Sequence, residues 1–133
     1  MSKAILYVAN TGIQNVPVNG VISLGSTIRR FGCGATLNGT GISITEPGYY
    51  AVNVSVTVAP TAAGDVTVTL LNNGVAVPGA TASETVAAAD DYANLSFESV
   101  IRTFCNATTG SLTLLLADTA SNVTNVAVTV ERL

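Results

Sequence analysis

Few residues of this chain could carry out chemistry. It has no histidine, a single lysine and no Gly-x-Ser-x-Gly sequence. A serine or cysteine nucleophile would therefore lack the base that normally activates it. We predict no catalytic residue, no metal and no cofactor, and the remaining polar clusters point to binding or structural roles.

Asp90, Asp91 and Tyr92 form the first such cluster, in a segment that reads as a loop. Neighbouring carboxylates on extended backbone point in opposite directions, so the two aspartates make a poor acid–base pair. Their simplest role is that of solvated loop charges. The alternative is a calcium site with oxygen ligands, completed by Asp118, Glu84 or backbone carbonyls. Because Tyr92 beside them could contact a glycan, these three residues are a candidate ligand loop.

Cys33 and Cys105 are the only cysteines and occur in the similar contexts "RRFGC" and "IRTFC". Two free buried thiols are one interpretation, which suits a protein made in a reducing compartment. A disulfide is the other, because matching contexts could lie on adjacent strands. Closing so long a loop would stabilise the fold by about 4 kcal/mol. Two cysteines without histidine supply too few ligands for zinc.

Arg29, Arg30 and Arg102 hold three of the five positive charges and precede the two cysteines in parallel fashion. We expect these arginines to gather in space. Ion pairs with carboxylates across a subunit contact are their simpler role, and recognition of a sulfate- or carboxylate-bearing sugar is the alternative. The carboxylates considered as partners are Glu46, Glu98 and Glu131.

The stretch "EPGYYAVNVSVTVAP", residues 46–60, must position part of this surface. Every second residue from Tyr50 to Val58 is apolar, and this period-two alternation predicts a strand with one face in a core. The interleaved residues are Ala51, Asn53, Ser55, Thr57 and Ala59. They are small and uncharged, which suits a face packed against a neighbouring subunit, where unpaired charges would be costly. The interface candidates are Tyr49, Tyr50, Ala51, Asn53, Ser55 and Thr57, and core packing is the alternative role for the two tyrosines.

Similar alternation recurs along the chain, separated by Gly, Pro and Asn turns, and helical periodicity hardly occurs. Residues 84–93 are ambiguous and are interpreted as a strand end followed by a loop. Pro78 lacks an amide hydrogen and should lie at a sheet edge or bend. Further strands are predicted at 4–10, on either side of an Asn-Gly turn in 16–24, at 41–45, in a hairpin over 65–79, and at 93–104, 110–119 and 125–133. This pattern predicts an all-β antiparallel sandwich or jelly roll, as one domain over residues 1–133.

The amino-acid composition limits the kinds of partner that this chain could bind. Charged residues make up 10% and hydrophobic residues 48%, with a net charge of −3. So few charges on a folded surface favour association with other copies of the chain, and without a basic face nucleic-acid binding is not expected. No apolar run is long enough to span a membrane. The N-terminal segment has too short an apolar run for a signal peptide, so synthesis and assembly in a cytoplasm are expected.

The order of "GYY" entering a long strand, "VTVTLLNNGVAVPG", "FESVIRTF", "SLTLLL" and the closing "VAVTVERL" resembles the tumour necrosis factor and complement-head superfamily. The resemblance covers essentially the whole chain. It implies a ten-strand, TNF-like jelly roll that assembles as a compact homotrimer, with the inner sheet of each protomer against the three-fold axis. The chain lacks a collagen-like stalk and an acidic calcium cluster that can be matched.

The style of the sequence, rich in Thr, Ala and Val, is similar to short bacterial and bacteriophage members of that superfamily. This resemblance implies a non-catalytic module on a virion surface, of the head-fibre or decoration type, with itself, capsid proteins and a cell-surface glycan as the expected partners. The alternatives are a carbohydrate- or ligand-binding recognition head and a structural protein of a spore coat.

Overall fold

The computed structural model describes residues 3–103 and 110–133. Over these residues the chain is built from strands, and none of them lies in a helix that could cross a membrane. The strands are β1 (Ile5–Asn10), β2 (Gln14–Val16), β3 (Ser26–Phe31), β4 (Ala35–Asn38), β5 (Gly41–Ile44), β6 (Gly48–Pro60), β7 (Gly64–Asn72), β8 (Val75–Val86), β9 (Ala93–Thr103), β10 (Gly110–Ala117) and β11 (Ser121–Arg132).

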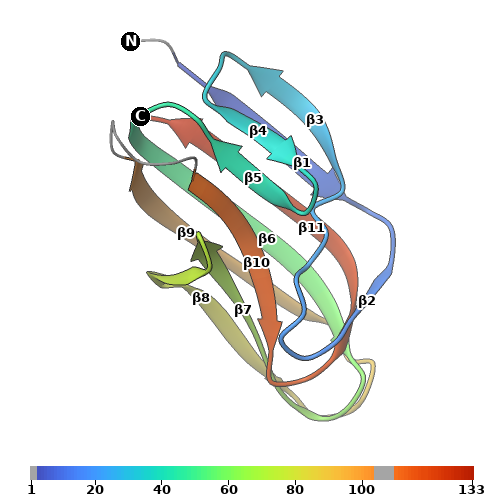
Figure 1. Ribbon diagram of the computed structural model, residues 1–133. Helices are drawn as coiled ribbons and strands as arrows, with labels where there is room; N and C mark the ends of the chain where they lie inside the picture. Colours follow the sequence, from blue (N-terminus) through green and yellow to red (C-terminus); the bar gives the residue numbers. More distant parts are fainter. Residues whose placement is uncertain (1–2, 104–109) are drawn as a thin grey trace.

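The strands form two antiparallel sheets that pack face to face, as Figure 1 shows. Sheet A has the order β3-β1-β11-β6-β9, with the short β2 also paired to β11. Sheet B has the order β4-β5-β10-β7-β8. The fold is therefore the predicted all-β, TNF-like jelly roll. The resemblance implies ten strands, whereas residues 3–103 and 110–133 contain eleven.

The core lies between the sheets and follows from the alternation in the sequence. In β6, Tyr50, Val52, Val54, Val56 and Val58 are all buried and face sheet B. Sheet B contributes alternate residues of its two central strands, because side chains on a strand point to opposite faces in turn. Those residues are Val66, Val68 and Leu70 of β7 and Leu112, Leu114 and Leu116 of β10.

Several predicted elements are confirmed. Asn73 and Gly74 form the turn between β7 and β8, with φ of 54° and 81°. Pro78 lies on β8, the edge strand of sheet B, where a missing amide hydrogen breaks no ladder. Residues 84–93 are the predicted strand end and loop, since β8 ends at Val86 and β9 begins at Ala93.

Of the two short strands predicted on either side of the turn in 16–24, the second is wrong. The turn at Asn19 and Gly20 is present, but the residues after it pair with β10 rather than with β2. The amide of Ile22 donates to the Leu114 carbonyl (2.9 Å), and Val21 forms an isolated bridge with Leu115. The sequence prediction also missed two strands, β3 and β4.

The sandwich has two ends, which carry different residues. At the terminal end lie the start of β1 and of β6, the end of β9, and the C-terminal end of β11. At the opposite end, called the distal end, lie the connections 61–63, 87–92 and 118–120. Because β6 has 13 residues, the two ends are about 40 Å apart.

Candidate functional site

The candidate site is the outer face of sheet A, which points away from the sandwich. Its side chains form rows, because residues paired across antiparallel strands lie on the same face. Among the rows that cross all five strands from β3 to β9, the one nearest the terminal end is Phe31, Ile5, Glu131, Ala51 and Val100. The next is Arg29, Tyr7, Thr129, Asn53 and Glu98, and the third is Ser26, Ala9, Ala127, Ser55 and Ser96.

These rows change character along the strands. The first contains the bulky apolar side chains Phe31 and Val100, which are 66% and 56% exposed. The third contains only serine and alanine. Where the second and third rows meet over β11, β6 and β9, the small side chains leave a shallow depression of about 410 Å³. Asn53 and Ser55 line it, so the predicted small, polar outer face of β6 is present and hollowed.

Five of the six interface candidates lie on this face, namely Tyr49, Ala51, Asn53, Ser55 and Thr57. Tyr49 points outward at the terminal end, where the guanidinium of Arg102 lies 5.6 Å from the centre of its ring. This distance fits a cation–π contact. Ala59, by contrast, is buried.

Tyr50 is wrongly included among the interface candidates, and the alternative core role is the one that the structure shows. The residue occupies an inward position of β6 and its exposed fraction is 0%. Its hydroxyl donates to the backbone carbonyl of Glu46 at 2.9 Å. Burial raises the pKa of this phenol above its ordinary value, with Arg132 acting in the lowering direction and the Glu46 carboxylate in the raising direction.

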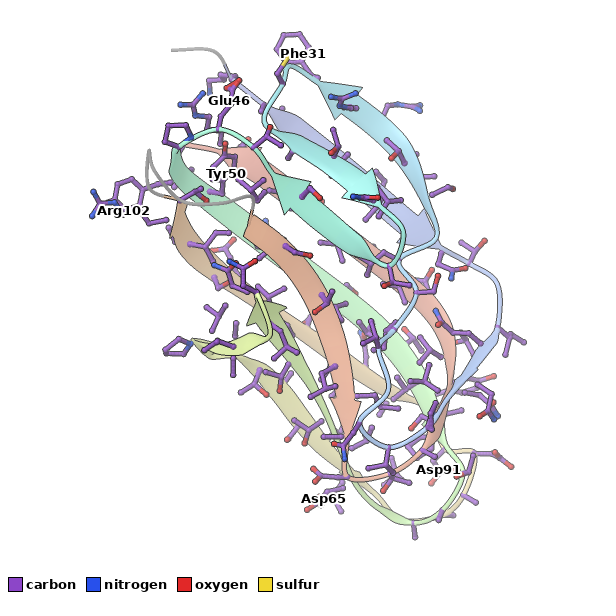
Figure 2. All side chains as sticks on the ribbon, in the orientation of Figure 1. Phe31, Glu46, Tyr50, Asp65, Asp91 and Arg102 are labelled. Carbon is purple, nitrogen blue, oxygen red and sulfur yellow. The ribbon has the colours of Figure 1, made fainter. Side chains whose placement is uncertain are left out.

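Arg132 was missed by the sequence analysis. It is largely buried next to Tyr50, and its Nη1 lies 3.1 Å from Oε2 of Glu46. Its Nη2 donates to the Pro47 carbonyl at 2.7 Å. Figure 2 shows Glu46 and Tyr50 close together at the terminal end. This cluster fixes the bend that leads into β6, and its surroundings make it structural rather than a binding site.

Arg29, Arg30 and Arg102 were expected to lie close together, and within one chain this prediction is wrong. Strands β3 and β9 are the two edges of sheet A, and four inter-strand spacings of about 4.8 Å separate them by about 19 Å. Arg29 donates to the carbonyl of Ile28, and the carboxylate Glu46 pairs with Arg132 instead. Hence no ion pair within the described chain joins Arg29 or Arg30 to the three expected glutamates.

Asp90, Asp91 and Tyr92 lie in the exposed connection between β8 and β9, at the distal end. Tyr92 is 73% exposed. Asp90 has a φ of 66°, and its amide donates to the Pro60 carbonyl at 2.8 Å, which fixes the loop against β6. Figure 2 shows Asp91 at the same end of the sandwich as Asp65, the second residue of β7.

Asp118, one of the ligands considered for the alternative calcium site, is bound elsewhere. Asp118 accepts a hydrogen bond from Thr67 Oγ1 at 2.6 Å, and Asp65 accepts one from Thr85. Over residues 3–103 and 110–133, no three histidine, cysteine or acidic side chains come together as a metal site. The carboxylates of Asp65 and Asp118 instead accept hydrogen bonds from threonine hydroxyls of sheet B.

Cys33 is exposed, on the turn between β3 and β4. Its exposure is at odds with the interpretation of two buried thiols. Cys105 lies outside the described residues, so the disulfide between them stays a prediction.

Comparison with known proteins agrees with this architecture. No protein-family model and no curated protein matches the sequence. Among solved structures, murine APRIL at pH 5.0 has a TM-score of 0.77 at 11% identity, covering 99% of this chain and 100% of that one. The globular domain of zebrafish complement 1qA protein has a TM-score of 0.70 at 9% identity, covering 97% and 95%. Vertex protein P5 of PRD1 has a TM-score of 0.66 at 16% identity, covering 98% of this chain and 96% of that one. At these identities the likeness establishes the fold.

Proposed function

We propose that this chain is a non-catalytic, homotrimeric surface protein of a bacteriophage or prophage virion, of the head-fibre or decoration type. The observation that carries the proposal is the outer face of sheet A. Small, mostly uncharged side chains cover its centre, with Asn53 and Ser55 lining a depression, and bulky apolar residues remain exposed at its edges. Such a face is suited to burial against a second protein surface.

The sparse charge of the whole molecule supports self-association. Thirteen charged side chains share 6502 Å² of accessible surface, about 500 Å² for each. Identical chains that gather around a common axis remove much of this surface from water. The superfamily that the sequence resembles implies a three-fold axis. Likeness to vertex protein P5 over almost the full length of both chains supports the location on a virion.

The function of such a trimer is assembly and presentation. The distal connections of three subunits would lie together and present Thr, Asn and Asp groups to weak ligands, whose binding several copies strengthen. Capsid proteins and a cell-surface glycan are the proposed partners. The location proposed is the virion surface, and a spore surface is the alternative.

Sedimentation velocity of the purified chain at micromolar concentration tests the assembly. We expect a species of three chains. A monomer at all concentrations up to about 100 μM, where contacts of micromolar affinity would be populated, would contradict the trimer. The location is tested separately by gold-labelled antibody against the chain. Label on intact particles released by lysis supports the virion, and label confined to spores supports the alternative.

A recognition head is the second candidate function, favoured by the exposure of Tyr92 beside Asp90 and Asp91. An exposed aromatic ring next to hydrogen-bond acceptors is a common way to hold a sugar. A glycan array probed with the wild type and with Tyr92→Ala tests it. Binding that the substitution abolishes supports this function. An equal loss in Tyr49→Ala, at the opposite end, would instead exclude the loop as the site.

A further inference from the structure

The two edges of sheet A carry complementary groups on the same face and in the same rows. Arg29 of β3 and Glu98 of β9 are the ends of the second row. Phe31 and Val100 are the ends of the first row. The β3 edge therefore carries a cation and an aromatic ring. The β9 edge carries, in the same two rows, an anion and an aliphatic side chain.

These groups cannot meet within one chain. The strand order puts β1, β11 and β6 between them, a separation of about 19 Å between the backbones. Arg29 and Glu98 are both exposed. The Arg29 guanidinium donates to the carbonyl of Ile28 at 2.9 Å, which uses one of its five N–H donors. Glu98 borders the depression over β11, β6 and β9.

We propose that a second copy of this chain joins these edges, so that Glu98 of one subunit pairs with Arg29 of the next and Val100 packs against Phe31. The proposal rests on the homotrimer proposed above. Rotation about an axis parallel to the strands moves a residue around the axis but keeps its height along it. Residues of one row therefore meet residues of the same row, and the two contacts form together at each of the three junctions.

Such a junction is heterologous, because β9 of one subunit meets β3 of its neighbour and the same step repeats until the ring closes. The charge pair fixes the register, since a shift of one row along the strands would put Glu98 beside Phe31 or a serine. It also orients the partner, because an inverted neighbour would bring like edges together. Charge pairs of this kind specify the partner and its orientation more than they add affinity.

Charge reversal tests the pairing. Arg29→Glu and Glu98→Arg are each measured alone and together by sedimentation velocity over a dilution series, with circular dichroism to confirm folding. We expect each single variant to raise the concentration at half-assembly by about tenfold or more, because like charges then face each other at three junctions. The double variant restores the pair in reverse and should return to within about threefold of the wild type.

Arg30→Glu is the matched control. It changes the net charge equally on the neighbouring residue of β3, but Arg30 pairs with Leu6 and so lies on the opposite face from Arg29. It should assemble as the wild type does. If the wild type is a trimer and Arg29→Glu behaves like Arg30→Glu, or if the double variant is no better than the singles, the pairing is overturned while the trimer stands. If the wild type never assembles, both the Arg29–Glu98 pairing and the homotrimer are overturned.

Discussion

At the scale of single residues, Tyr50 and its neighbours show why the start of β6 is fixed. The phenol is enclosed by the core, its hydroxyl has one defined acceptor in the Glu46 carbonyl, and Arg132 lies beside it. Burial disfavours the phenolate, which is why the pKa is raised. A polar group placed in this way links protonation to stability.

We expect this link to be visible at alkaline pH. Since the folded-state pKa of Tyr50 lies above the ordinary value of 10.0, the protonated phenol stabilises the fold fully below pH 10, and this contribution is lost as pH rises through the raised pKa. Tyr50→Phe should lower the free energy of unfolding near neutral pH by about 1 kcal/mol, through the lost hydrogen bond, and should flatten its decline above pH 10.

Urea unfolding between pH 8 and 11.5 (a window set by the ordinary phenol value) measures this difference. Tyr49→Phe is the matched control, because it removes a phenol hydroxyl on the outer face of β6 and leaves the Tyr50 hydrogen bond intact. An alkaline decline in Tyr50→Phe as steep as that of the wild type would assign it to other groups.

Arg132 gives the second prediction at this scale. Arg132→Ala removes the ion pair with Glu46 and the bond to the Pro47 carbonyl, and leaves both acceptors in a half-buried site. We expect a loss of about 2–3 kcal/mol in the free energy of unfolding, below the cost for a fully buried pair because Glu46 is partly exposed. Arg30→Ala, on the exposed edge strand, should change stability by less than about 0.5 kcal/mol.

At the scale of elements, Asn73 has two roles in the turn between β7 and β8, one through its backbone and one through its side chain. Asn73 adopts a positive φ, and its Oδ1 accepts a hydrogen bond from the Ser111 amide at 2.9 Å, which joins the hairpin to β10. Asn73→Gly keeps the backbone and removes the bond, for a cost of about 1 kcal/mol. Asn73→Ala adds the strain of a left-handed alanine, so we expect about 2–3 kcal/mol.

Urea unfolding curves of the two variants separate these contributions. The alanine variant should be the less stable of the two by more than 1 kcal/mol (about the strain of one left-handed residue). If both variants lose the same stability, the positive φ is not a requirement of this turn.

The strands that sequence alone predicts are those with a buried face. In β6 and β9 the alternation of apolar and polar residues records which side faces the core, so their existence and orientation could be predicted. In β3 every residue is exposed, and "STIRRF" has no buried face to produce a pattern. This strand exists because its backbone pairs with β1 at a sheet edge, and that pairing depends on tertiary structure.

The candidate site was predictable to the same extent. The parity of β6 put Asn53 and Ser55 outside and Tyr50 inside, and Tyr50 was wrongly kept with the outer group. The ion pair of Arg132 with Glu46 joins residues 86 positions apart, so no local spacing could indicate it. The separation of the arginines likewise follows from the strand order, which similar local contexts cannot specify.

At the scale of the whole molecule, the charges are divided between the two ends of the sandwich. The basic side chains belong to the half with the termini: Lys3, Arg29, Arg30, Arg102 and Arg132. Five of the eight carboxylates belong to the distal half: Asp65, Glu84, Asp90, Asp91 and Asp118. Repulsion among the distal carboxylates is therefore not relieved by a nearby lysine or arginine, and three subunits around one axis would concentrate it.

This division predicts how salt acts on stability. Asp90→Asn/Asp91→Asn removes two exposed distal charges, and asparagine tolerates the positive φ of position 90. In 10 mM salt, where screening is weak, the double variant should melt about 2 °C above the wild type. In 500 mM salt, where the Debye length is only a few ångström, the two should melt together. Lys3→Gln, at the other end, should not gain this stability. A wild type that shows no difference from the asparagine variant at low salt would mean that the distal carboxylates are too well solvated to repel one another.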